Sequence, residues 1–76
     1  MTAIKEHNRI VLTMDIPEQK LAAGDVGTVV HIHDKAKAYE VEFVALNGET
    51  MLVITLEQNQ VRPIRRHEIT HARQVA

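Results

Sequence analysis

The chain has 76 residues, contains no cysteine and carries a formal net charge of −1. This length allows one domain, and the lack of cysteine excludes disulfides and cysteine-based zinc sites. The N-terminal residues are polar rather than apolar as in a signal peptide, and the longest nearly apolar run, residues 51–56, is too short to cross a bilayer. We therefore expect a soluble, cytoplasmic protein with no membrane contact. So small a domain without covalent cross-links also favours a homodimer or another protein partner.

The first predicted strand covers residues 9–14, with Ile10 and Leu12 on one face and Val11 on the other. Residues 15–25 contain a proline and a glycine and predict a long loop. The loop residues expected to contact the core are Ile16 and Leu21.

A second strand is predicted over residues 26–33, but its apolar residues do not alternate regularly. Val26, Val29 and Ile32 are spaced by three residues instead of two. A β-bulge would reconcile this spacing with a strand, and Gly27 is the expected place for the backbone to bend.

The clearest strand covers residues 38–44, where Tyr39, Val41 and Phe43 alternate with glutamates. Apolar side chains on one face and carboxylates on the other predict a strand between core and solvent. Asn47-Gly48 follows between two apolar runs and predicts a tight hairpin, because both residues tolerate positive φ.

The returning strand of this hairpin is predicted over residues 50–56, and residues 57–60 predict a single helical turn. Residues 61–63 form a last short strand, which its proline ends or confines to a sheet edge. Residues 64–76 have no β pattern and predict a basic C-terminal tail or a short helix that is marginal without a docking surface.

These elements predict an all-β domain over residues 1–63, built as a small five-stranded barrel, because closure leaves no exposed sheet edges. The predicted core consists of the strand residues Ile10, Leu12, Val26, Val29, Ile32, Tyr39, Val41, Phe43, Val53, Ile54 and Val61.

Three segments resemble an SH3-like barrel: residues 23–30 (AGDVGTVV), residues 39–43 (YEVEF), and Leu56 with residues 61–63 (VRP). With the Asp-Ile-Pro of residues 15–17, the pattern is similar to a small bacterial family known only as domain of unknown function 4926. Similar barrels include ribosome-associated KOW modules, small peripheral subunits of photosystem I and the β-subunit barrel of nitrile hydratase. The resemblance therefore implies a non-catalytic adaptor, for example the antitoxin, immunity or accessory member of a two-protein pair.

The charges are unevenly distributed along the chain. Residues 1–61 hold five basic and nine acidic side chains, a net −4, whereas residues 62–76 hold four arginines against one glutamate, a net +3. Arginines interspersed with apolar residues suit a protein interface. The predicted partner-binding residues are Arg62, Arg65, Arg66, His67, Ile69 and Arg73. The alternative for this segment is a solvated terminus.

Catalytic chemistry is not indicated by the sequence. There is neither serine nor cysteine to act as an acyl-transfer nucleophile, and the three glycines are too scattered to cradle a phosphate. The pairs His31/His33 and His67/His71 offer two ligands each, whereas a zinc site needs three or four. We expect no enzyme activity, no cofactor and no metal site.

A KOW-like RNA-binding module is the alternative function, since arginines of the tail are suited to contact phosphates. Against it stand the acidic body and the presence of only two aromatic residues, Tyr39 and Phe43, both predicted in the core. Base stacking, the usual basis of single-strand binding, then lacks its side chains. Protein binding is the function that the sequence favours.

Overall fold

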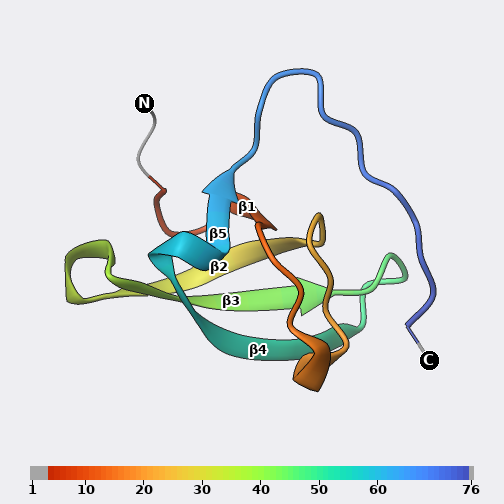
Figure 1. Cartoon of the computed structure of the whole chain (residues 1–76), viewed down its shortest axis with the longest axis horizontal. Coiled ribbons are helices and arrows are strands. Elements are labelled where there is room, and N and C mark those ends of the chain that lie inside the picture. The colour runs from red at the N-terminus through yellow and green to blue at the C-terminus, as the bar shows by residue number, and fades with distance from the viewer. Residues whose placement is uncertain (1–3, 76) are drawn as a thin grey trace.

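The computed structural model describes residues 4–75, which form five strands and three short 3₁₀ helices (Figure 1). The strands are β1 (Arg9–Leu12), β2 (Val26–His33), β3 (Ala38–Val44), β4 (Thr50–Glu57) and β5 (Val61–Pro63). The 3₁₀ helices are η1 (Pro17–Gln19), η2 (Asp34–Ala36) and η3 (Gln58–Gln60). All strands belong to one antiparallel sheet in the order β4-β3-β2-β1-β5, which confirms an all-β fold with five strands. The outer strands β4 and β5 are not paired with each other, so the predicted closure without sheet edges is not found among the described residues. No helix in the described range is long and apolar enough to span a membrane.

The β3–β4 hairpin follows from its sequence pattern as predicted. Tyr39, Val41 and Phe43 are buried, while the glutamates between them are half-buried on the opposite face. In the connecting turn the Ala45 N–H donates to the Glu49 carbonyl at 2.8 Å, and Gly48 has a φ of 94°. A positive φ at this position is the reason that glycine suits the turn.

The irregularity in β2 is real, but its predicted position at Gly27 is wrong. The register with β3 shifts between Val29 and His31, so the bulge lies at Val30. Gly27 is instead regularly paired with Ile10 and buried in the sheet. A Cβ at Gly27 would lie 2.5 Å from a methyl carbon of Val41. Glycine occupies this position because the core approaches the backbone too closely for a larger residue.

The core lies on one face of the curved sheet and differs from the prediction in β4. Its buried members are Ile10, Leu12, Leu21, Val29, Tyr39, Val41, Phe43, Leu56 and Val61, with Ile4, Ile16, Ile32, Ala36, Leu52 and Ile54 partly buried against them. Val53 was predicted in the core and is 50% exposed, because alternation places Leu52, Ile54 and Leu56 on the inner face. Val26 is only half-buried, and so is Ile32, although Ile32 contacts the core.

The side chain of Val11 points to the other face of β1 from Ile10 and Leu12, where an exposed residue would be expected. It is nevertheless buried, with 5% of its surface exposed. The segment after β5 returns over this face, and Val11 lines the groove that the segment bounds. The described part of this segment, residues 64–75, contains no helix, so the helical alternative for the tail is wrong.

Candidate partner-binding site

The C-terminal segment leaves β5 at Pro63 and crosses the molecule toward the β3–β4 hairpin (Figure 1). Pro63 ends the strand because its nitrogen has no hydrogen to donate to a ladder. The segment lacks secondary structure, so side-chain contacts with the domain fix its path. Two such contacts, at Glu68 and at Arg73, divide the segment into a turn and a strap.

The turn, residues 65–68, is closed by Glu68. Arg62 in β5 donates from Nη1 to Glu68 Oε1 at 3.0 Å and from Nη2 to Oε2 at 2.6 Å. The backbone N–H of Arg65 also donates to Glu68 Oε1. These bonds lower the pKa of Glu68 to about 2, and the hydrogen bonds from Arg62 have the largest effect. The same hydrogen bonds raise the pKa of Arg62. His67 adopts a φ of 63°, which lets the chain reverse within the turn. A paired guanidinium and carboxylate thus hold the turn on the end of the sheet.

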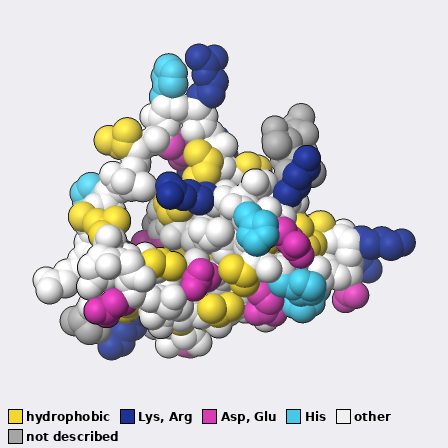
Figure 2. Space-filling view, turned by 180° about the vertical axis from the view of Figure 1, so that it is seen from behind, with side chains coloured by type: hydrophobic (Ala, Val, Ile, Leu, Met, Phe, Trp, Pro, Cys, Tyr) yellow, Lys and Arg dark blue, Asp and Glu magenta, His cyan; other side chains and the backbone are white. Residues whose placement is uncertain are grey.

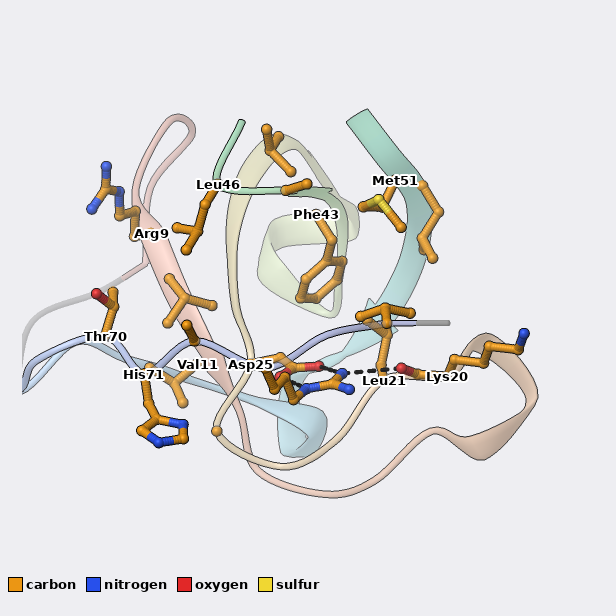
Figure 3. A pocket seen from close by; sticks show the side chains of 18 of the residues that line it. Arg9, Val11, Lys20, Leu21, Asp25, Phe43, Leu46, Met51, Thr70 and His71 are labelled. Atoms are coloured by element: carbon orange, nitrogen blue, oxygen red, sulfur yellow. Dashed lines mark hydrogen bonds and ion pairs between the residues drawn. The ribbon is translucent and has the colours of Figure 1, made fainter. Parts of the chain in front are cut away.

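The strap, residues 69–75, is anchored by Arg73 on the loop before β2. Its Nε donates to Asp25 Oδ1 at 2.9 Å and its Nη2 donates to the Lys20 carbonyl at 3.0 Å, with a further ion pair from Nη2 to Asp25 Oδ2 (Figure 3). Desolvation raises the pKa of Asp25, but Arg73 and the Ala22 N–H outweigh it, so that pKa is lowered. The Arg73 side chain is 38% exposed and the Asp25 side chain 19%. Nε and Nη2 of Arg73 contact both carboxylate oxygens of Asp25, so the anchor has the same bidentate geometry as the Arg62–Glu68 pair and holds the strap on the domain.

A groove of about 990 Å³ lies between the strap and the sheet (Figure 3). Its floor carries apolar side chains from the first three strands, the hairpin and the loop before β2, among them Val11, Leu21, Phe43, Leu46 and Met51. Polar anchors around an apolar floor are typical of a surface that binds a ligand or a partner.

The structure separates the predicted partner-binding residues into two sets. Arg62 and Arg73 are engaged within the chain, with Glu68 and Asp25 respectively. Four other predicted residues are exposed: Arg65, Arg66, His67 and Ile69. Ile69 is 92% exposed, which is unusual for a large apolar side chain and suits a residue that inserts into a partner.

Asp25 and Glu68 act in this site although the sequence did not indicate them as binding residues, whereas Lys20 lies in the loop of residues 15–21, which the sequence offers as a secondary recognition region. Asp25 and Lys20 lie 48 and 53 residues from Arg73 along the chain, so no local spacing points to them. The available signal was the charge asymmetry, since an acidic body is expected to attract a basic tail.

The histidines of β2 form a polar network on the outer face of the sheet. The His31 and His33 rings meet edge to face at 4.6 Å, and His33 Nε2 lies 2.7 Å from Glu40 Oε2. The Thr55 hydroxyl also donates to Glu40. The hydrogen bond from Thr55, and after it the one with His33, lowers the pKa of the Glu40 carboxyl. Figure 2 shows the molecule from behind, and histidine and acidic side chains lie side by side on the lower half of this face. Within residues 4–75 no group of three or more metal-ligating side chains comes together.

The chain matches the model of the family called Domain of unknown function (DUF4926) over residues 6–63. This match covers most of the chain, so the protein belongs to that family. It contains all five strands and ends at Pro63, where the C-terminal segment begins. No curated protein and no solved structure matches the chain.

Proposed function

We propose that this protein is a non-enzymatic protein-binding module, acting as the accessory or neutralising member of a two-protein pair. The observation that supports this most is the turn at residues 65–68, which a paired carboxylate fixes while the neighbouring side chains stay exposed. A turn held in one conformation loses little entropy on binding. Arg65 and Arg66 supply two positive charges there, and Ile69 supplies an apolar anchor.

The partner surface that fits this site is acidic and contains an apolar recess. Carboxylates of the partner would pair with the guanidinium groups of Arg65 and Arg66, and the recess would receive Ile69. The groove beneath the strap adds a second contact region, since apolar side chains line it between the strap and the sheet. The burial of Tyr39 and Phe43, the sequence's two aromatics, disfavours nucleic acid as the ligand.

We also infer that the sheet curls into a partly open SH3-like barrel, in which the edges of β4 and β5 stay unpaired. Support comes from the strand order β4-β3-β2-β1-β5, from the long β1–β2 loop and from η3 directly before β5. Loops on a rigid barrel commonly carry recognition, so this architecture suits a binding module. The fold alone does not assign a function.

The test is affinity purification of the tagged full chain from its own cells, with and without nuclease, followed by titration of the captured protein. We expect Arg65→Glu/Arg66→Glu to weaken binding at least about tenfold, because reversed charges meet like charges at the interface. Arg65→Gln/Arg66→Gln, which adds no repulsion to Glu68, should weaken it less. The matched control is Lys35→Glu/Lys37→Glu, which changes the net charge equally at the β2–β3 turn. Equal affinity of the Arg65/Arg66 variant and wild type would refute the site, and recovery of RNA that nuclease removes would favour the KOW-like alternative.

A further inference from the structure

The two edges of the sheet are protected very differently. β5 has three residues and ends in proline, which is the usual protection of an edge strand. β4 has eight residues, TMLVITLE, with no proline, glycine or lysine and with its one charge at the last position. Such an edge presents unpaired N–H and C=O groups in a row and is a template for another strand.

The hydrogen bonds around β2 establish which backbone groups of the sheet point in which direction. The Val29 N–H donates to the Asn8 carbonyl at 2.9 Å, and the His7 N–H donates to the Val29 carbonyl at 2.7 Å. Val29 therefore directs both of its backbone groups toward the β1 side. Neighbouring residues of a strand point their groups in opposite directions, so Thr28 directs its groups toward β3 and its partner Glu42.

The same alternation continues into the edge strand. Because Glu42 bonds toward β2, Val41 directs its groups toward β4, where it pairs with Ile54. Ile54 is thus bonded to β3, and its neighbours Val53 and Thr55 direct their N–H and C=O groups away from the sheet. No hydrogen bond to the backbone of either residue is found outside the strand ladders of the described chain. These four groups make up the regular part of the free edge, since the ladder is disturbed at Met51 and the Glu57 N–H already donates to Gln60 Oε1.

We propose that β4 pairs antiparallel with β4 of a second copy of this chain, about a two-fold axis at Ile54. This register places Val53 opposite Thr55 of the second copy, and Thr55 opposite Val53 of the second copy. Each N–H then donates to a facing C=O, so four hydrogen bonds satisfy the N–H and C=O groups of Val53 and Thr55 in both copies. The two sheets become one continuous sheet.

The side chains of β4 favour a second copy as the occupant. No charge lies between Thr50 and Leu56, so the strand offers nothing to recognise a charged peptide, and two copies approach without repulsion. Leu52 and Ile54 are only half-buried, and in this register Ile54 of the second copy would face Ile54 while Leu56 of the second copy would face Leu52. On the outer face Val53, 50% exposed, would contact Thr55 of the second copy.

The register is determined by the bulge at the start of β4. The pairing of β3 with β4 shifts between Phe43 and Val44, which leaves Met51 without a regular partner. An axis at Val53 would place Thr55 opposite Met51 of the second copy, where the ladder is disturbed. An axis at Ile54 confines the new bonds to Val53 and Thr55. This dimer does not depend on the C-terminal turn, so it can be tested separately from the proposed function.

The first test is amide hydrogen exchange of the wild-type chain at two concentrations about 100-fold apart, together with sedimentation equilibrium. If the chain is in a monomer–dimer equilibrium, the Val53 and Thr55 amides should exchange at least about tenfold more slowly at the high concentration. If sedimentation shows a dimer at both concentrations, these amides should be protected at both concentrations. The Ile54 amide, bonded to β3, is the internal control and should be protected in monomer and dimer. A monomeric mass with fast exchange at Val53 and Thr55 at both concentrations would overturn the proposal.

Single cysteines test the register, since the chain has none of its own. Residues at the axis face each other as a non-hydrogen-bonded pair with Cα atoms about 4.5 Å apart, a separation that a disulfide spans. Ile54→Cys should therefore oxidise to a covalent dimer, whereas Leu52→Cys, equally half-buried on the same face, should stay monomeric. Cross-linking of Val53→Cys instead would show the other register and refute the axis at Ile54. Protection of the edge amides that appears only when a different protein is added would refute the second copy as occupant.

Discussion

Substitution of Gly27 by alanine tests the close approach of β2 to the core. The added Cβ would lie 2.5 Å from Val41 Cγ1 and 2.9 Å from Phe43 Cε1. Val41 is 0% and Phe43 4% exposed, so neither side chain can rotate away into solvent. Overpacking of this kind costs about 1–3 kcal/mol, and the loss of glycine entropy from the unfolded chain returns about 0.4–1 kcal/mol. We expect a net destabilisation of about 1–2 kcal/mol, out of a total of about 4–11 kcal/mol for a chain of this length.

Urea denaturation and thermal melting measure this effect, which should lower Tm by about 5–15 °C. Gly48→Ala is the control: it has a positive φ but no atom within 4 Å of the added Cβ, so its cost comes from the backbone alone. The decisive variant is Gly27→Ala combined with Val41→Ala, which removes the methyl carbon at 2.5 Å. The double variant should be more stable than the sum of the single effects predicts, by about 0.5 kcal/mol or more. Strict additivity, or a Gly27→Ala variant as stable as wild type, would refute the close contact.

Three further predictions concern the core, the β2–β3 turn and the C-terminal turn. Phe43→Ala should lose about 3–5 kcal/mol and with it most cooperative unfolding, and an unchanged melting midpoint would contradict the core position of this ring. Ala36→Gly should stabilise the fold by no more than about 0.5 kcal/mol, measured by urea denaturation, since it relieves a φ of 73° but removes a methyl group that packs against the core; a gain above about 1 kcal/mol would contradict this. Because the folded pKa of Glu68, about 2, lies below its ordinary 4.5, its bonds stabilise the turn fully above pH 4.5 and are lost as the pH falls through about 2. Carbon-13 NMR of the carboxyl should show this midpoint in wild type and a value nearer 4.5 in Arg62→Gln, and identical midpoints would exclude the pairing.

The strands that were predicted correctly from the amino-acid sequence are those whose bounds are marked by nearby residues. The bounds of β2, β3 and β5 agree with the prediction, because the loop glycine before β2, the alternation in β3 and Pro63 in β5 each act within a few residues. The run at residues 51–56 is apolar throughout, so alternation did not show which side chains face inward. Only the pairing with β3 decides that Val53 is exposed while Leu56 is buried.

Long-range contacts account for the remaining differences. The sequence indicated a bulge in β2, but its place at Val30 depends on the register with a strand that follows later. Likewise the tail was identified as basic, whereas the pairing of Arg73 with Asp25 joins residues 48 positions apart. Such contacts depend on how the domain brings its loops together, which composition and local periodicity do not contain.

The two proposed surfaces lie at different places on the sheet, and this has a consequence for stoichiometry. The turn at residues 65–68 follows β5, and β5 and β4 are the opposite edges of the sheet order. A dimer joined through Val53 and Thr55 of β4 does not use the turns, so both turns remain available to partners. Such a dimer would bind two partner molecules, and a partner that is itself dimeric would bind more tightly through avidity. Blocking the β4 edge would then abolish this avidity and leave the affinity of each single site unchanged.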